Sequence, residues 1–273
     1  MSRMFSRRNV LILGAGAAAA GALGVTGYAQ ADVAATASEW IRLPIITANI
    51  GRKRLSKREA AIRAVRSGDR GHRPLVGWQE IGEGDSGEKA MIAKHFDEHY
   101  KNPFLRDGRA YRVPFSIPNH WTVVSTKRNF VHRGIEGWSP ERWINEVVLR
   151  HVKYTGIEFA LINSHYIANA YNGDRKPSLQ DEWRKHRKLH GNRVLAHHAA
   201  GRPVIWTGDV NRPDYTTASG RSAEKKAFSK GIDRINWLPA GDKIQIQLQG
   251  TRTVDMDVDS HNARVAIFRI RLA

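Results

Sequence analysis

Residues 204–213 have the sequence VIWTGDVNRP, in which an apolar run ends on a carboxylate and a carboxamide. The run at 204–207 is rich in β-branched and aromatic side chains, which predicts a buried strand that Gly208 ends. Asp209 and Asn211 are two residues apart and would point to the same side of an extended backbone. The first can bind a metal or polarise water and the second can donate a hydrogen bond to an oxyanion, which suits phosphoryl chemistry. A strand end closed by an Asx turn is the structural alternative.

Polar side chains also stand at or within four other predicted strands. They are Asn49 in 43–50, Glu80 in 74–81, His165 in 157–167 and Asp233 in 231–237. Each has a structural alternative when it is taken alone: a turn cap for Asn49, a solvated strand end for Glu80, and a buried structural histidine for His165. Their repetition at strand ends indicates one shared site.

The remaining pattern is that of an α/β layered domain. Helices are predicted at 56–67, 88–100 and 177–200, and further strands at 109–113, 121–126, 144–152, 243–248 and 264–272. Residues 153–156 form a predicted hairpin turn, and 214–230 form a polar loop. Helices alternate with strands in the first third of the chain and strands follow one another in the middle, so we expect mixed sheets with much antiparallel pairing.

The helix at 177–200 contains histidines at metal-binding spacing. His186 and His190 are four residues apart and could share a helix face, but no zincin-type glutamate lies between them. Five basic neighbours in 184–193 favour a solvated cationic face instead. The same interpretation applies to His197 and His198.

Composition limits the classes of function. The 273 residues can bury one large core. The absence of cysteine excludes disulfides, thiolate metal sites and cysteine nucleophiles, so any metal must be held by oxygen or imidazole. The net charge is +18; residues 1–31 carry three cations and no acid, which leaves +15 on the remainder. Such an excess favours polyanionic partners such as nucleic acid or an anionic membrane surface.

The N-terminal segment has the pattern of an export signal. Arg7 and Arg8 precede an apolar, Gly/Ala-rich run at 10–25, and residues 29–31 form a small-x-small cleavage site. The resemblance to twin-arginine signals implies bacterial-type export of a folded protein by the twin-arginine machinery, with a mature start near Asp32. We therefore expect a signal at 1–31, a linker at 32–42 and one domain at 43–273. An uncleaved membrane anchor is the alternative, because the apolar run approaches the ~20 residues that a span needs.

The ordered set of polar motifs resembles the endonuclease/exonuclease/phosphatase superfamily, which has the deoxyribonuclease-I-like fold. The motifs are TANI at 47–50, WQEI at 78–81, NSH at 163–165, GDVN at 208–211, GIDRI at 231–235 and DSH at 259–261. The resemblance covers residues 43–272, with little contribution from 83–145. It implies a four-layered α/β/β/α sandwich of two mixed, largely antiparallel sheets with the helices outside and the site at one edge.

By this resemblance, Glu80 with help from Asn49 holds Mg²⁺ or Mn²⁺, hard cations that suit oxygen ligands. The family has Asp immediately before its last His, but Ser260 stands there in this chain and the acid is Asp259. On a strand this offset turns the carboxylate to the opposite face, unless a bulge restores it. Asp259 is therefore the candidate second metal contact only if such a bulge is present.

The same resemblance implies the catalytic roles. Asp209 orients or deprotonates the attacking water, and Asn211 fixes a phosphate oxygen. His165 and His261 donate hydrogen bonds to the transition state. Asp233 holds His261 in one tautomer and favours its protonated form.

We therefore expect an exported, monomeric, Mg²⁺-dependent phosphodiesterase that acts as a nuclease on DNA or RNA, without a membrane anchor once the signal is cleaved. Two alternatives remain open. One is a phosphatase or phospholipase of the same fold that acts on inositol phosphates or sphingomyelin. The other is an inactive polyanion-binding domain. The membrane enzyme would need exposed apolar loops, and no strongly apolar stretch of this kind follows residue 31.

Overall fold

The computed structural model describes residues 39–51, 57–69, 71–82, 87–137, 139–258 and 261–273. These residues belong to one compact unit of the chain, residues 35–273. The expected signal at 1–31, most of the expected linker, and Asp259 and Ser260 lie outside the described residues. Within the described part, no helix is long and apolar enough to cross a membrane.

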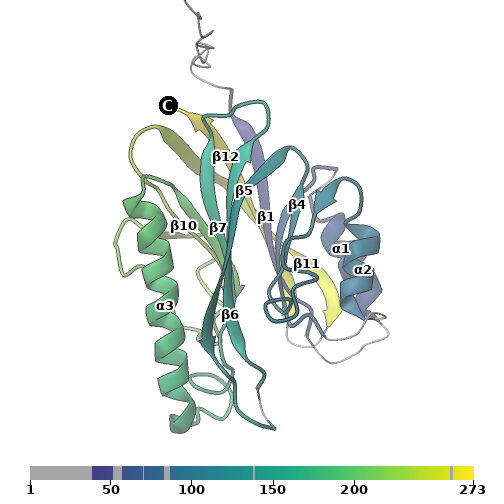
Figure 1. Cartoon of the computed structure of the whole chain (residues 1–273), viewed down its shortest axis with the longest axis vertical. Coiled ribbons are helices and arrows are strands. Elements are labelled where there is room, and N and C mark those ends of the chain that lie inside the picture. Colours follow the sequence, from purple (N-terminus) through teal and green to yellow (C-terminus); the bar gives the residue numbers. More distant parts are fainter. Residues whose placement is uncertain (1–38, 52–56, 70, 83–86, 138, 259–260) are drawn as a thin grey trace, which may run out of the picture. The chain divides into compact units, whose positions relative to one another are not determined.

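Two six-stranded sheets form the centre of this unit (Figure 1). The first has the order β11-β12-β1-β2-β4-β3 and consists of β1 (Ile41–Asn49), β2 (Leu75–Gln79), β3 (Tyr100–Lys101), β4 (Phe115–Pro118), β11 (Ile244–Val258) and β12 (His261–Leu272). The second has the order β5-β6-β7-β8-β10-β9 and consists of β5 (Trp121–His132), β6 (Arg142–His151), β7 (Glu158–His165), β8 (Val204–Asp209), β9 (Lys225–Lys226) and β10 (Asp233–Leu238). Each sheet is mixed, because β1–β2 and β7–β8 are parallel pairs and the other pairs are antiparallel.

The helices cover the outer faces of the sheets (Figure 1). The first sheet carries α1 (Arg58–Arg66) and α2 (Glu88–His95). The second carries α3 (Gln180–Ala199), which follows a short 3-10 turn at Pro177–Leu179. The expected α/β/β/α sandwich is therefore confirmed.

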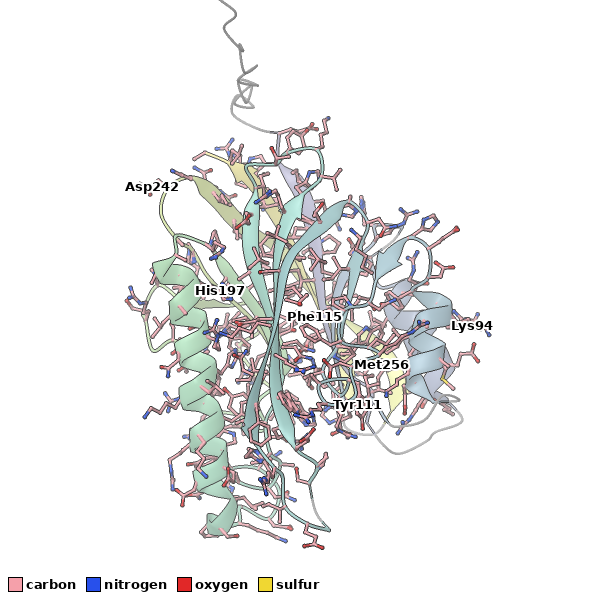
Figure 2. All side chains as sticks on the ribbon, viewed as in Figure 1. Lys94, Tyr111, Phe115, His197, Asp242 and Met256 are labelled. Atoms are coloured by element: carbon pink, nitrogen blue, oxygen red, sulfur yellow. The ribbon has the colours of Figure 1, made fainter. Side chains whose placement is uncertain are left out.

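Alternation along the central strands builds two kinds of apolar layer. On β1, Leu43 and Ile45 belong to the core between the sheets, which includes Phe115 (Figure 2), whereas Ile46 and Ala48 pack under α1 and α2. The strand β7 repeats the pattern between the inter-sheet core and α3. Because both faces of these strands are buried, they read as continuous apolar runs in the sequence.

A polar network joins the two sheets near the site. Gln79 donates to Asn163 Oδ1 over 2.6 Å, Thr207 donates to the same oxygen over 3.0 Å, and Thr47 donates to Gln79 Oε1 over 3.2 Å. The sheets approach closely here because Gly77 has no side chain: a Cβ at this position would lie 2.1 Å from Thr207 Oγ1. This network fixes one sheet against the other beside the site, and it was not predicted from the sequence.

Several predicted boundaries were wrong. Residues 109–113 form turns and not a strand, because the Asn145 side chain donates hydrogen bonds to the carbonyl oxygens of Ala110 and Val113 at 2.8 and 3.0 Å. The helix α2 ends at His95 and not near residue 100. The next residue, Phe96, turns inward and packs against Trp78. Two of the strands, β5 and β11, extend well beyond their predicted ends, and the short strands β3 and β4 were not predicted.

The histidines of α3 were also assigned to the wrong face. His186 and His190 are fully buried and His197 nearly so, and Figure 2 shows His197 on the inner side of the helix. A ring nitrogen of each histidine forms a hydrogen bond with a buried partner. His186 pairs with Ser164 Oγ at 2.6 Å, His190 with the Tyr166 hydroxyl at 2.9 Å, and His197 with a Glu146 carboxylate oxygen at 3.0 Å. The inner face of α3 therefore combines these hydrogen-bonded histidines with apolar residues such as Trp183 and Val194, and the exposed Arg and Lys side chains form the expected cationic outer face.

Candidate active site

Four of the predicted site residues meet where the central strands of both sheets end. The Asn49 amide nitrogen lies 3.0 Å from Asp209 Oδ2 and 3.5 Å from Glu80 Oε1. His165 Nε2 lies 3.6 Å from the same Glu80 oxygen and 3.8 Å from Asp209 Oδ2. Parallel pairing explains the meeting, because it brings the carboxyl ends of β1 and β2, and of β7 and β8, to one edge.

Asp233 and His261 complete the cluster from two further strands. Antiparallel pairing places Asp233 opposite Asp209, at the start of β10. His261 begins β12, and its Nδ1 lies 3.1 Å from Asp233 Oδ2. One ligand atom each from Asp209, Asp233 and His261 lies within 4.8 Å of the others. Six of the eight predicted site residues therefore converge.

Asn211 lies beside this cluster in a different conformation from the one expected. The strand β8 ends at Asp209, and Asn211 is left-handed with φ 48°. Its N–H donates to Asp209 Oδ1 over 2.7 Å, which is an Asx turn. Its side-chain nitrogen donates to the Tyr166 carbonyl oxygen over 3.0 Å, and its side-chain oxygen accepts from Asn172 over 2.8 Å. The Asx-turn alternative is thus correct for the backbone, and Asn211 orients the Asp209 carboxylate.

Glu80 also has a left-handed backbone, with φ 62°. This conformation is uncommon for a residue with a long side chain, and such residues cluster at functional sites. The following residues are held by hydrogen bonds: Ile81 N–H donates to the Arg112 carbonyl oxygen, and Gly82 N–H donates to the Glu88 carboxylate. Glu88 is buried in an ion pair with Arg58. The turn aims the Glu80 carboxylate at the edge where Asp209 lies.

The buried carboxylates change the protonation of the site. Burial, together with the charge of Asp233, raises the pKa of Asp209 to about 7. Burial lowers the pKa of His261, but the hydrogen bond and charge of Asp233, with those of Asp209 and Glu80, outweigh it and raise this pKa to about 9. A pKa of about 9 keeps His261 protonated and positively charged at neutral pH.

A second histidine has the opposite protonation. Burial, followed by the charges of Arg142 and Arg112, lowers the pKa of His165 well below its usual value. Arg142 Nη1 lies 3.3 Å from His165 Nδ1. Because an arginine can only donate, Nδ1 must be the acceptor and Nε2 must carry the proton. His165 thus presents an N–H to the carboxylates of Glu80 and Asp209.

Arg142 and Arg112 were not predicted as site residues. Both are buried arginines next to the site, and their charges act on His165. Arginine is almost never fully buried unless it is paired, but the sequence alone does not say which of the chain's many arginines is buried. In the structure Arg142 begins β6, which pairs with the strand that bears His165, but the predicted strand began two residues later, at 144.

The donor set fits a hard divalent cation. Glu80, Asp209 and Asp233 bring three carboxylates together against one imidazolium, and hard cations prefer oxygen ligands. One carboxylate oxygen of Asp233 is buried without a hydrogen-bond partner among the described residues. Asn49 offers a different contact from the one expected: its amide oxygen accepts from Gly51 N–H at 3.0 Å, so its nitrogen faces the carboxylates. Asp259, the remaining candidate ligand, lies outside the described residues, although β11 does have a register shift between Val254 and Val258.

Comparison with known proteins gives a result only at the level of structure. No family model matches the chain, and no curated protein matches it. Among solved structures, it is similar to an endonuclease/exonuclease/phosphatase from Bacteroides vulgatus, with 16% identity and a TM-score of 0.62 over 84% of this chain and 98% of that one. It is also similar to D. rerio TDP2 complexed with a single-strand DNA product, with 12% identity and a TM-score of 0.60 over 83% and 98% of the two chains. The human Nocturnin catalytic domain with a bound sulfate anion gives 12% identity and a TM-score of 0.57 over 84% and 96%.

These identities are low, so the likeness concerns the fold. The chain has the fold of the endonuclease/exonuclease/phosphatase proteins, as the sequence motifs predicted. The similarity extends over 98% of both the Bacteroides vulgatus and the D. rerio structure.

Proposed function

We propose that the protein is a metal-dependent phosphodiester hydrolase and that it acts as a nuclease. The observation that carries the proposal is the position of Asp209, which lies 3.0 Å from the Asn49 amide and within the same 4.8 Å cluster as Asp233 and His261. A buried carboxylate beside an imidazolium and a cluster of acids can handle a water molecule and a phosphate together. The fold shared with phosphodiester-cleaving proteins supports this proposal.

Three side chains of the cluster have different roles in the proposed reaction. Asp209, held by Asn49 and by the Asn211 N–H, orients the attacking water and accepts its proton. Protonated His261, held by Asp233, donates a hydrogen bond to the phosphate oxygens as negative charge develops. His165, whose Nε2–H faces Glu80 and Asp209, donates a second hydrogen bond to the phosphate oxygens.

Mg²⁺ or Mn²⁺, held by Glu80 with the nearby acids, would supply positive charge that stabilises the leaving oxygen. The three carboxylates of the site carry more negative charge than one imidazolium balances, and a divalent cation would neutralise the excess. Removal of divalent cations with EDTA should therefore abolish hydrolysis, and Mg²⁺ or Mn²⁺ should restore it.

Nucleic acid is the substrate that the charge favours. The chain has an excess of 18 positive charges, and a polyanion binds such a surface by releasing its counterions. D. rerio TDP2, which shares the fold, has been seen with a single-strand DNA product. A phosphatase, a phospholipase and an inactive polyanion-binding domain are the outcomes that the test below would reveal instead.

The test is a substrate panel with matched variants. The purified protein is offered DNA, RNA, a phospholipid and a phosphomonoester with Mg²⁺, and Glu80→Gln, Asp209→Asn and His261→Ala should each lower turnover by at least ~10²-fold. Asp242→Asn is the control, because Asp242 is exposed and precedes β11 at the end of the sheet opposite His261 (Figure 2). Full activity in Asp209→Asn, or activity on the phosphomonoester alone, would overturn the proposal.

We also propose that the protein is exported by the twin-arginine machinery and works as a monomer outside the cytoplasm. The support is Arg7 and Arg8 before an apolar run, and the small-x-small site at 29–31. Changing both arginines to lysine should leave the protein in the cytoplasm. N-terminal sequencing of the exported form should give a start near Asp32, whereas Met1 or Ser2 at that position would contradict cleavage.

A further inference from the structure

A pocket lies beside the catalytic cluster. It has a volume of about 390 Å³ and is lined by Ala170, Tyr171, Arg175, Gln180, Arg212, Pro213 and Asp214. Sites for small molecules and cofactors usually occupy about 300–1,000 Å³, so this pocket can hold a group the size of a nucleotide. Neither the resemblance nor the roles assigned above use any of these residues.

One wall of the pocket is a stack of flat groups. The Arg212 guanidinium lies 4.2 Å from the centroid of the Tyr171 ring, which also lines the pocket, and 5.2 Å from that of Trp183, which is buried and does not line it. Two hydrogen bonds to the Asp214 carboxylate, at 2.6 and 2.9 Å, hold the Arg212 guanidinium in its position over the Tyr171 ring. Nucleobases stack on aromatic rings and on arginine planes irrespective of their sequence, so a fixed surface of this kind favours a base.

The pocket is tied to the catalytic cluster by the loop at 166–176. Asn172 donates to Asn211 Oδ1 over 2.8 Å, and the Asn211 N–H in turn holds the Asp209 carboxylate. Two further hydrogen bonds close the loop: Lys176 N–H donates to the Asn169 carbonyl oxygen over 2.6 Å, and Asn169 N–H donates to Asn172 Oδ1 over 2.8 Å. The pocket and the carboxylate that would position water are therefore held in one frame.

Arg175 supplies a positive charge at the rim of the pocket. Its backbone is left-handed, with φ 50°, and its side chain is exposed. Among the described residues, its guanidinium has no hydrogen-bond or ion-pair partner, whereas Arg212 is already paired with Asp214. A phosphate that entered the rim could contact this guanidinium, whose charge also acts on the nearby Asp214 carboxylate.

We propose that this pocket binds the nucleotide next to the scissile phosphate. The base would stack on the Tyr171–Arg212 wall and its outer phosphate would contact Arg175. This proposal rests on the proposed nuclease function, because it places one more unit of the same polymer beside the cluster. It predicts that the enzyme senses the presence of a base at one position near the cleaved bond, whatever that base is.

The test uses oligonucleotides in which a stable abasic residue replaces one nucleotide at successive positions around the cleaved bond. With the wild-type protein, KM should rise by about tenfold or more for one position only. Arg212→Lys keeps the charge but loses the plane, so it should raise KM for the intact oligonucleotide by a similar factor and make that abasic position no worse than the others. Arg175→Gln should instead lower the slope of log KM against log salt concentration by about one, because one phosphate contact is lost.

Arg269→Lys is the matched control. Arg269 also lies over an aromatic ring, 4.3 Å from the centroid of Trp40, and is also held by a side-chain acceptor, Gln247. It sits in the half of β12 that pairs with the start of β1, far from Asn49 along that strand. Arg269→Lys should leave the abasic pattern unchanged, and melting temperatures should confirm that all three variants are folded.

The outcomes separate this proposal from the one on which it rests. If the wild-type protein cleaves nucleic acid but every abasic position has the same effect, or Arg212→Lys keeps the selective position, the nucleotide pocket is wrong and the nuclease stands. If no nucleic acid is cleaved while another phosphodiester is, the nuclease proposal fails and the pocket proposal fails with it.

Discussion

Asp233 and His261 form an ion pair across the two sheets, with Oδ2 and Nδ1 3.1 Å apart. The carboxylate comes from the first residue of β10 and the imidazole from the first residue of β12. The pair therefore exists only when the two sheets are packed, so the protonation of the site depends on the tertiary fold.

Asp233→Asn should remove the main support for the charge on His261. The hydrogen bond and charge of Asp233 are the largest effects that raise the pKa of His261 to about 9, and burial opposes them. We expect this pKa to fall by more than one unit, and kcat to fall by at least about 10²-fold at neutral pH. Histidine titration by NMR measures the first effect and steady-state kinetics the second. A pKa that stayed near 9 would show that Asp209 and Glu80 suffice.

Gly77→Ala should destabilise the inter-sheet contact. A Cβ at this position would lie 2.1 Å from Thr207 Oγ1 and 2.8 Å from Asn163 Oδ1, both of which belong to the buried network. We expect a loss of about 3 kcal/mol in the free energy of unfolding, because well-packed interiors do not accept an added methyl group. Urea denaturation measures it.

Gly108→Ala is the control for this change. An added Cβ there meets nothing within 4 Å, so the free energy of unfolding should change by less than about 0.5 kcal/mol. Equal losses in the two variants would mean that the sheets are not held as closely as the structure has them.

Acidification should weaken the packing of α3 through His190. Burial lowers the pKa of this residue to about 4, whereas the unfolded chain has the ordinary value of 6.5. The unfolded state therefore takes up the proton first, and the stabilisation present above pH 6.5 is lost as the pH falls from 6.5 towards 4. The contribution of His190 between pH 7 and pH 5 is about 2 kcal/mol.

His190→Gln removes the titration and keeps a polar group for the Tyr166 hydroxyl. The free energy of unfolding of this variant should fall by about 2 kcal/mol less than that of the wild type between pH 7 and pH 5. His198→Gln, on the same helix but outside the buried row, is the control. Parallel pH curves for the wild type and His190→Gln would show that His190 does not titrate as a buried neutral ring.

The convergence of these polar residues was predictable because their signal is local. A polar residue such as Asp209 or Glu80 directly after an apolar strand is visible in the sequence, and strand ends of one sheet meet at one edge. The left-handed backbone of Asn211 was not predictable in this way, because it depends on Tyr166 and Asn172, some 40 residues earlier in the chain.

The missed features depend on contacts between distant segments. Gln79 and Asn163 are 84 residues apart, and neither shows from its neighbours that it will be buried against the other. The buried face of α3 was mispredicted for a related reason. It contains histidines, which a hydrophobic pattern does not detect. Apolar periodicity predicts apolar cores well and polar interiors poorly.

The last prediction separates a nuclease from a small-molecule phosphodiesterase by salt dependence. The cations of α3 that face outward include Arg187 and Lys188, both exposed, whereas Arg58 of α1 is buried with Glu88 and cannot contact a polymer. If about six phosphates are contacted, affinity for a long nucleic acid should fall by roughly 10³-fold between about 50 and 200 mM salt. A small chromogenic diester reaches only the cluster around Asp209 and should change little. Replacing Arg187 and Lys188 together by Gln should lower the logarithmic slope for the nucleic acid by about two, because each phosphate contact contributes about one. Measurement of KM for both substrates over this salt range tests the idea, and an equally shallow dependence for both would assign the protein to the phosphatase or phospholipase class.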